Sequence, residues 1–334
     1  MTTAIPAPTA DAYALLRDDA AQADRSDRLR MAFTGVQAAA ALTGLVTSDV
    51  LALQPGHGQY AAALTPKGKV IADLRIFRRV DGGFLVDTAA AAGPGFAAMV
   101  RKYVNPRLAR ADDVSATLEC IGVAGPHARQ VVAHALACSP AAFDLLPPYA
   151  HCEMPFDGED VLVARAPDYG VDAFDCFLGT ARAGALRDAL AAAGAAPAEA
   201  AALEVLRIEA GRPAWGTDMT EETLAQEAGL DTLDAISYTK GCYTGQEVVA
   251  RVHFRGHVNR VLRGLRTAAL APGEAQVLAG EVEVGVVRSR AVSPRLGPIA
   301  LAMMRREVEP GTSVTVRFAS GDVSGAVVAL PFPA

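Results

Sequence analysis

Three apolar runs separated by two tight turns constrain the fold more than any other feature of this chain. Residues 58–88 read "GQYAAALTPKGKVIADLRIFRRVDGGFLVDT". The triplets Pro66-Lys67-Gly68 and Asp81-Gly82-Gly83 are turn formers, because proline fixes φ and glycine tolerates conformations closed to other residues. The runs between them have the length and composition of strands. We therefore predict three consecutive strands joined by turns.

Strands and short helices alternate around this region. Residues 28–35 read as a strand and 36–46 as a short helix, and apolar spacing predicts helices over 91–104 and 181–194. The Ala/Pro stretch 191–202 is the most linker-like internal segment. After Gly264 the chain becomes rich in Val, Gly and Pro, with short strand-like runs separated by turn residues, which is typical of a small closed β-domain.

Composition limits the class of protein. The chain has 334 residues, 51% hydrophobic and 20% charged, as in soluble globular proteins of two or three domains. Its formal net charge of -6 argues against a general nucleic-acid binder. We expect no transmembrane segment, because the apolar runs are alanine-rich and broken by charges. We expect no signal peptide, because the first residues lack both a basic region and a continuous apolar region. A cytoplasmic location and no membrane partner follow as expectations.

The cysteines predict no structural cross-link and no metal site. There are five, an odd number, with wide spacing and no C-x-x-C. For four of them, Cys120, Cys138, Cys152 and Cys176, we expect small buried side chains in a reduced protein. Cys242 differs because of its neighbours.

The segment "YTKGCYTGQEVVAR", Tyr238 to Arg251, surrounds that cysteine with polar and small residues. Thr244 followed three residues later by Glu247 has the form of a capping box, which predicts a helix that begins here. Glu247 and Arg251 would then form an i, i+4 pair. This places Cys242 just before a helix N-terminus.

That position, together with the nearby Lys240, would favour the thiolate of Cys242 over the thiol. Gly241 and Gly245 would let a ligand approach the backbone closely. A tight strand–turn–helix junction with a buried cysteine and ordinary capping explains the same residues equally well. The residues alone leave both interpretations open.

Two further polar groups are candidates for binding. The stretch 251–266 holds five arginines without an acid among them, which indicates either a solvated basic edge or a site for a carboxylate tail, a phosphate or RNA. Upstream, Arg207 and Glu209 alternate in "LRIEAG", which we interpret as a strand. An Arg–Glu pair on one strand face is more often structural than catalytic.

The motif "KGCYTGQEVVAR" resembles the signature of the YgfZ family, relatives of the glycine-cleavage T-protein. Supporting matches include "LTPKGKVIADLRIF", "LRIEAGRPAWGTDM" and "VGVVRSRAVSPRLGPIALAMMRRE", so that the resemblance covers roughly residues 28–332. It implies an α+β fold in which a T-protein-like folate-binding module of intertwined α/β subdomains precedes a C-terminal β-barrel. We expect a flexible N-terminus and short helix over 1–24, the folate-binding module over 25–256 with a subdomain split near 112–200, and the barrel over 257–334.

The same resemblance implies tetrahydrofolate as the cofactor and a role as an accessory factor in assembly or repair of [4Fe–4S] proteins, with a link to tRNA methylthiolation. Iron–sulfur proteins or their assembly machinery would be its partners. Cys242 matches the key cysteine of the family and is the functional thiol in this interpretation, whereas its chemistry stays open. The expected folate-binding residues are seven positions of the motif and three polar positions elsewhere: Lys240, Gly241, Tyr243, Gly245, Gln246, Glu247 and Arg251, with Asp73, Arg207 and Glu209.

Two departures separate this chain from the T-proteins themselves. The resemblance places an acidic pair of T-proteins at Ala72-Asp73, where only one carboxylate remains, and "DYGVDAFD" offers no clear equivalent of their T-G-E-x-G segment. Both favour a maturation factor over a glycine-cleavage enzyme.

The alternative is a tetrahydrofolate-dependent aminomethyl- or methyltransferase, with Asp73 as acid/base and with Arg207 and Glu209 orienting the substrate. An RNA-binding protein that uses Arg251 and the arginines up to residue 266 is the weakest of the three interpretations, because the chain is acidic overall.

Overall fold

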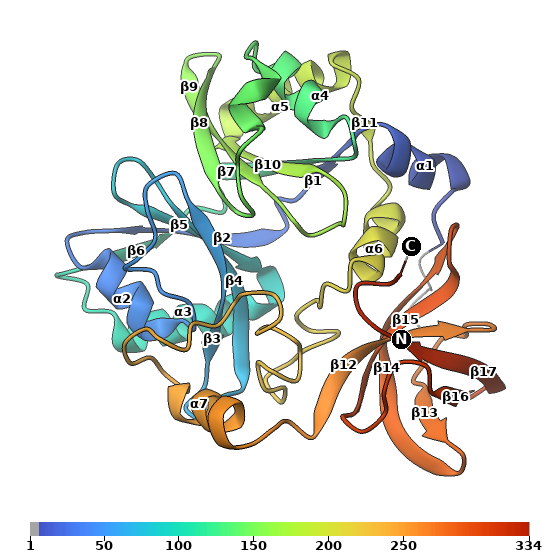
Figure 1. Ribbon diagram of the computed structural model, residues 1–334. Coiled ribbons are helices and arrows are strands. Elements are labelled where there is room, and N and C mark those ends of the chain that lie inside the picture. Colours follow the sequence, from blue (N-terminus) through green and yellow to red (C-terminus); the bar gives the residue numbers. More distant parts are fainter. Residues whose placement is uncertain (1–6, 334) are drawn as a thin grey trace.

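A five-stranded antiparallel sheet, a six-stranded mixed sheet and a closed barrel make up the computed structural model, which describes residues 7–333. Figure 1 shows the six-stranded sheet with its helices at the top, the five-stranded sheet to the left and the barrel at the lower right. The five-stranded sheet has the order β3-β4-β5-β2-β6, and the six-stranded sheet has the order β11-β1-β7-β10-β9-β8. The α+β architecture with a C-terminal barrel is confirmed.

The strands of the five-stranded sheet lie where the apolar runs predict them, and turns join β3, β4 and β5. Their bounds are β2 (Arg28–Thr34), β3 (Gly58–Leu64), β4 (Val70–Arg78), β5 (Phe84–Ala89) and β6 (Arg110–Asp113). One face of this sheet packs against α2 (Ala38–Leu45) and α3 (Gly93–Tyr103). Phe96, Met99 and Val100 of α3 are buried in that core, as their spacing predicts, whereas Tyr103 is half exposed.

The six-stranded sheet takes one strand from the start of the chain and the others from beyond residue 117. Its strands are β1 (Ala21–Asp24), β7 (Leu118–Ala124), β8 (His151–Phe156), β9 (Glu159–Arg165), β10 (Ala173–Gly179) and β11 (Ala196–Pro197). The helices α4 (Ala128–Ala135) and α5 (Thr180–Ala192) cover its outer face. The stretch that looked linker-like therefore supplies β11 and the start of α6. Because β1 precedes β2 but joins the other sheet, the two subdomains are intertwined.

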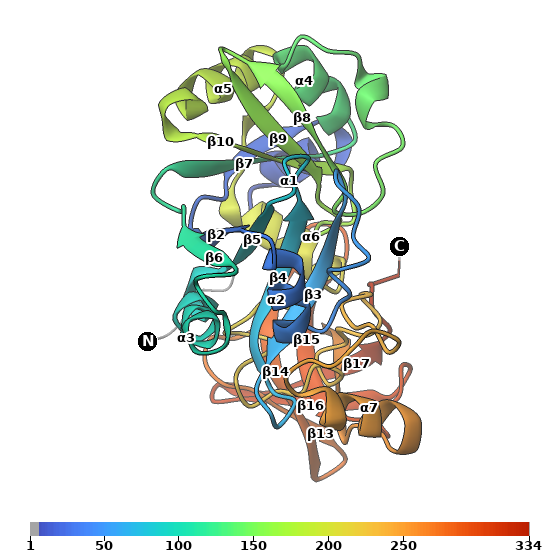
Figure 2. The ribbon, with the colours of Figure 1, turned by 90° about the vertical axis from the view of Figure 1, so that its left-hand side faces the viewer.

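The inner faces of the two sheets meet in a shared core. Tyr60, Phe77 and Leu85 from one sheet pack with Leu162 and Phe177 from the other. Helices thus lie outside and sheets inside, and Figure 2 shows α4 and α5 above the sheets and the barrel below. The longest helix within residues 7–333 has 13 residues, and no helix there has the length and apolar character needed to cross a membrane.

The barrel follows helix α7 (Gln246–Arg255) and is closed by six antiparallel strands. They are β12 (Arg260–Thr267), β13 (Gln276–Ala279), β14 (Val282–Ser293), β15 (Gly297–Arg305), β16 (Ser313–Phe318) and β17 (Gly321–Val328). Leu265, Ala300 and Val316 fill its interior. The barrel's outer side packs against α6 (Ala200–Glu209), which Figure 1 shows between the upper sheet and the barrel.

The prediction that Arg207 and Glu209 share one strand face is wrong, because both lie in the last turn of α6. Two positions apart on a helix, their side chains point in different directions. Glu209 is buried and accepts hydrogen bonds from the hydroxyls of Tyr13 in α1 (Ala10–Asp18), at 2.9 Å, and of Ser293 in the barrel, at 2.5 Å. Glu209 therefore fastens α1, α6 and the barrel together.

We expect Glu209→Ala to lower the free energy of unfolding by about 2–4 kcal/mol, because it leaves two buried hydroxyls without their acceptor. The measurement is chemical denaturation of the variant beside Glu247→Ala, which removes an exposed carboxylate and should change stability by less than about 0.5 kcal/mol. Equal stability of the two variants would contradict this role.

Candidate functional site

A cavity of about 150 Å³ opens between the two sheets and the loop that follows α6. Its walls come from β2, β3, β4, the β9–β10 loop and residues 212–215. An adjoining outer cavity of about 520 Å³ shares Arg25, Arg28, Ala89, Tyr169 and Arg207 with it. We call the first cavity the inner chamber, the adjoining one the outer chamber, and the two together the central cavity.

Asp73 is the carboxylate of the inner chamber that no arginine pairs with, among the ion pairs of the described residues. It lies on β4, is 9% exposed, and its Oδ2 accepts a hydrogen bond of 2.8 Å from the Tyr60 hydroxyl. Its Oδ1 is buried and finds no hydrogen-bond partner among residues 7–333. Burial raises the pKa of Asp73 above its ordinary value, and the attraction of Arg28 offsets this only in part.

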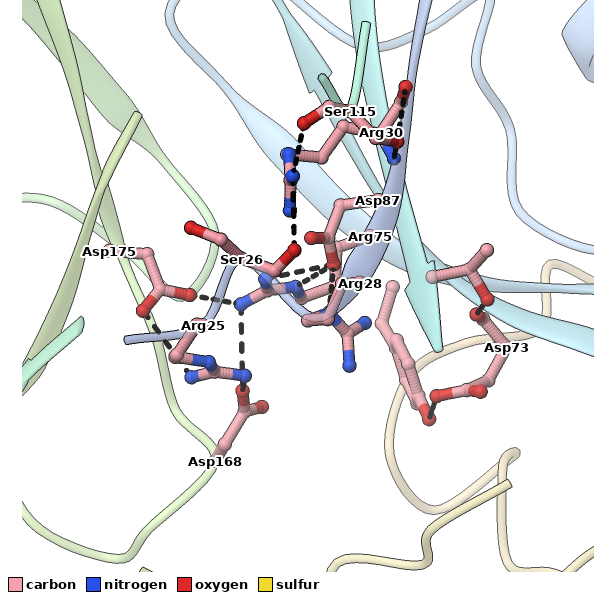
Figure 3. Close-up of polar contacts among 12 residues, drawn as sticks. Arg25, Ser26, Arg28, Arg30, Asp73, Arg75, Asp87, Ser115, Asp168 and Asp175 are labelled. Carbon is pink, nitrogen blue, oxygen red and sulfur yellow. Dashed lines mark hydrogen bonds and ion pairs between the residues drawn. The ribbon is translucent and has the colours of Figure 1, made fainter. Parts of the chain in front are cut away.

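Arginines neutralise three other carboxylates that lie between the two sheets, Asp87, Asp168 and Asp175, as Figure 3 shows. Asp87 on β5 accepts from Arg28 at 2.6 Å and from Arg75 at 2.8 Å. Asp168 lies 3.2 Å from Arg25, and Asp175 on β10 binds both Arg25 and Arg75. Arg75 thus connects Asp87 in the five-stranded sheet to Asp175 in the six-stranded sheet.

These arginines reverse the effect of burial on the pKa of their partners. Burial alone would raise the pKa of Asp87, but Arg28 and Arg75 outweigh it and hold that pKa well below the usual range. Arg25 and Arg75 do the same for Asp168, again against burial. Asp87 and Asp168 therefore stay charged, whereas Asp73 can exchange a proton with a ligand.

Rings and unpaired polar atoms complete the inner chamber. Tyr60, Tyr169 and Trp215 line it, and Trp215 Nε1 is a buried donor without a partner among residues 7–333. One free acceptor, one free donor, aromatic walls and nearby guanidinium groups suit a flat, hydrogen-bonding heterocycle with an acidic tail. The donor set of this chamber therefore fits a reduced pterin with a glutamate tail.

The structure brings only part of the predicted site to this cavity. Asp73 and Arg207 line it, and Arg207 is held by Asp218 at 2.9 Å. Glu209 faces α1 and the barrel instead. The residues that the motifs did not identify are Arg25, Arg28, Tyr60, Arg75, Asp168, Tyr169, Arg212 and Trp215. Charged residues inside otherwise apolar strands, as in "VIADLRIF", are the signal that could have found some of them.

Ala72 and Asp73 lie on opposite faces of β4, which changes what the missing carboxylate at position 72 implies. Neighbouring strand residues point to opposite faces, and Ala72 is fully buried in the core under α2 and α3, whereas Asp73 faces the cavity. A carboxylate at position 72 would not line this cavity. The single carboxylate is therefore no argument against transfer chemistry here, which corrects our sequence-based expectation.

The "KGC" segment forms a separate structure beside α2 and the turn between β3 and β4. The Lys240 ammonium is buried and donates to the carbonyl oxygens of Thr43, Val46 at 2.6 Å and Ser48 at 2.9 Å. Tyr243 is buried in the core between the sheets. Cys242 and Gly241 between them are exposed, and none of the motif residues lines the central cavity.

The capping box is wrong. Helix α7 begins at Gln246, and its N-cap is Gly245 in the left-handed region with φ 86°, without a side-chain cap. Glu247 and Arg251 are both exposed, and residues 7–333 contain no ion pair between them. Lys240 donates its ammonium group to backbone carbonyl oxygens rather than to a partner at Cys242.

We expect Gly245→Ala to destabilise the segment by about 2 kcal/mol or more, because a side chain is strained at this φ. An added Cβ would also meet the Thr65 carbonyl oxygen at 2.7 Å. Gly241→Ala is the matched control, since its Cβ would have no neighbour within 4 Å. Thermal unfolding of both variants is the measurement, and a similar loss in both would contradict the explanation.

Residues 7–333 contain no group of three or more His, Cys, Asp or Glu placed to hold a metal ion. All five cysteines are free thiols. The polar chemistry described so far is therefore that of the central cavity and of the exposed Cys242.

Comparison with known proteins adds a family to this geometry. Residues 5–237 match the family described as the GCVT N-terminal domain, and residues 260–333 match the glycine cleavage T-protein C-terminal barrel domain. Similar relatives include an aminomethyltransferase of Rubrobacter xylanophilus, 33% identical over 92% of this chain and 82% of the relative. Another, from Bordetella petrii, is 32% identical over 95% of this chain and 86% of the relative.

A solved structure shares the fold. The crystal structure of glycine cleavage system aminomethyltransferase T from Bartonella henselae superposes with a TM-score of 0.86 and covers 97% of this chain and 89% of its own. Its sequence identity of 23% limits this likeness to the fold.

Proposed function

The chain belongs to the glycine cleavage T-protein family, and from that premise we propose that it binds tetrahydrofolate in the central cavity and transfers a one-carbon unit as an aminomethyl- or methyltransferase. The observation that carries the proposal is the buried Asp73 carboxyl with one unpaired oxygen inside a cavity walled by aromatic rings. Relatives named aminomethyltransferase support the transfer activity.

The residues of the cavity would have different roles in folate binding and in transfer. Trp215 Nε1 and Asp73 Oδ1 are the free donor and acceptor for the heterocycle. Arg212, which lines the inner chamber and forms no ion pair within residues 7–333, suits a carboxylate of the tail. Tyr60 holds Asp73 in place through its 2.8 Å hydrogen bond. Tetrahydrofolate, when bound, supplies the nitrogen that carries the one-carbon unit. Asp73, whose pKa is raised by burial, exchanges the proton that this transfer requires.

Folate binding can be read from the protein's own fluorescence. Trp215 is the single tryptophan of the chain and lines the inner chamber, so tetrahydrofolate should change its emission in a saturable way. An emission that stays constant at saturating folate, with no heat of binding by calorimetry, would sink the folate assignment.

We expect Asp73→Asn to lose about 100-fold or more in transfer of a one-carbon unit from an aminomethyl donor, while folate still perturbs Trp215 emission. The same variant should be more stable than the parent near neutral pH. A raised pKa means that the folded carboxylate is disfavoured, so the destabilisation by Asp73 grows as pH rises from the ordinary carboxyl pKa through the raised one and disappears below both.

The measurements are transfer rate and thermal unfolding of Asp73→Asn against pH, with the exposed Asp112→Asn as control. Full activity in Asp73→Asn would contradict the proton-transfer role. A stability difference from the parent that grows toward low pH would contradict the raised pKa.

A second candidate rests on Cys242. This thiol is exposed on a segment that Lys240 and Tyr243 anchor from both sides, and it lies outside the central cavity. Such a placement favours contact with another macromolecule and supports the accessory role in assembly or repair of iron–sulfur proteins, with its link to tRNA methylthiolation. The names of the relatives support the transferase more than this role.

Cys242→Ala separates the two functions. For a transferase, we expect unchanged folate binding and one-carbon transfer in the purified variant, because Cys242 does not line the cavity. For an accessory factor, we expect reduced iron–sulfur enzyme activity in cells under oxidative stress. Cys138→Ala, another free cysteine, is the control, and normal iron–sulfur activity with Cys242→Ala would exclude the accessory role of this thiol.

A further inference from the structure

The arginines of residues 251–266 do not line the central cavity, and they lie in different environments. Arg251 and Arg255 are exposed on α7, and Arg266 donates to the Pro333 carbonyl oxygen at 3.3 Å. Arg260 binds Glu227. Arg263 lines a second cavity of about 520 Å³.

We call this second space the junction cavity. It lies where α7 leads into β12, a connection visible in Figure 1, and residues 226–233 and the C-terminal segment near Leu330 close it. Its volume is in the range of small-molecule sites. Val252, Val258 and Leu262 give it apolar walls.

The charged groups of the junction cavity leave a positive excess. Arg263 and Arg306 both line it, and neither forms an ion pair within residues 7–333. Arg263 Nε is buried without a hydrogen-bond partner there. Of the two acids on the wall, Glu227 is taken by Arg260 at 3.0 Å, and Asp231 accepts from the Thr232 amide. A neutral amide does not cancel the charge of Asp231, so the two unpaired guanidinium groups leave an excess of one positive charge on the wall, in a protein whose net charge is -6.

The positive charge continues past the rim of the cavity. Arg260 on β12 and Arg305 on β15 are direct cross-strand partners, and both are exposed. Because Arg260 also binds Glu227, Arg305 is the member of this pair that no carboxylate within residues 7–333 neutralises. Arg255 is exposed in the last turn of α7, five residues before Arg260 in the sequence.

An aromatic surface borders the same cavity. The His253 ring, on the cavity wall, stacks on Tyr238 with centroids 3.6 Å apart. Phe254, 67% exposed, packs edge-on against His253 at 4.7 Å. Aromatic rings beside guanidinium groups are the combination that binds a base and its phosphate together.

From this juxtaposition we propose that the junction cavity binds a nucleoside phosphate, either as a free nucleotide or as a unit of a single-stranded RNA. The base lies against the apolar wall and the His253 ring. The phosphate binds between Arg263 and Arg306. For RNA, neighbouring phosphates follow the Arg260–Arg305 pair.

The test is a titration of the purified full chain with three probes: AMP, a fluorescent RNA of roughly 10 nucleotides, and tri-γ-glutamate. Tri-γ-glutamate presents carboxylates without a base, so it separates a nucleotide site from a site for a folate tail. Binding of AMP alone identifies a free nucleotide, and tighter binding of the RNA identifies a strand.

Arg306→Gln and Arg263→Gln should each weaken binding about tenfold, because each removes a charged hydrogen bond to phosphate. The exposed Arg306→Gln tests the proposal even if the half-buried Arg263→Gln unfolds. Arg101→Gln, an exposed arginine on α3, is the matched control and should bind like the parent, as should Asp73→Asn. In the RNA arm, each of the two cavity variants should reduce the salt slope by about one.

The proposal is wrong if neither AMP nor RNA binds up to about 1 mM, if tri-γ-glutamate binds more tightly than both, or if Arg306→Gln binds nucleotide like the parent.

Discussion

The two sheets are held face to face by a charge network buried between them. Arg28, Arg75 and Asp87 come from the five-stranded sheet, whereas Asp175 comes from the six-stranded one. Arg75 joins the two groups by binding both Asp87 and Asp175, and Arg25, in the connection between β1 and β2, binds Asp168 and Asp175. Loss of any one partner would leave a buried charge uncompensated, which costs several kcal/mol. The network fixes the relative position of the sheets, and with it the shape of the central cavity.

The same network explains why neighbouring carboxylates can have opposite chemistry. Asp87 and Asp168 are bound by arginines and stay ionised. Asp73, two residues from Arg75 on the same face of β4, receives only the Tyr60 hydroxyl and keeps one oxygen free. Asp87 and Asp168 are thus the charged groups that hold the site together, whereas Asp73 is the carboxyl group that can react.

Much of the fold could be predicted from the sequence because its signals are local. Apolar runs and the turns at residues 66–68 and 81–83 indicate β3, β4 and β5 correctly. "LRIEAG" misleads because a few alternating residues resemble a strand, although they end a helix that begins at Ala200. Thr244 fits a capping pattern, but the chain passes so close to Thr65 that Gly245, in a left-handed conformation, takes the N-cap position.

The central cavity was harder to predict because its residues come from positions between 24 and 215. Sequence spacing says nothing about which of them meet, and sheet pairing decides it. Asp73 was found through the family resemblance and Arg207 through its polar neighbours, whereas Asp168 and Tyr169 lie in "DYGVDAFD", where the resemblance finds no clear equivalent of the T-G-E-x-G segment. The sequence predicts that Ala72 and Asp73 point to opposite faces of β4. It does not predict which of the two faces lines the cavity.

The place of β1 in the sheet has a consequence for the order in which the nascent chain can fold. β1 pairs with β7, where Ala21 lies opposite Ala124, and with β11, where Ala21 lies opposite Ala196. During synthesis the five-stranded sheet can pair as soon as residue 113 has left the ribosome, while β1 still waits with both edges open. Such an edge invites pairing with other chains. The stretch of translation between residues 24 and 124 is therefore when this protein is most exposed to misassembly, and a pause in synthesis there would lengthen that exposure.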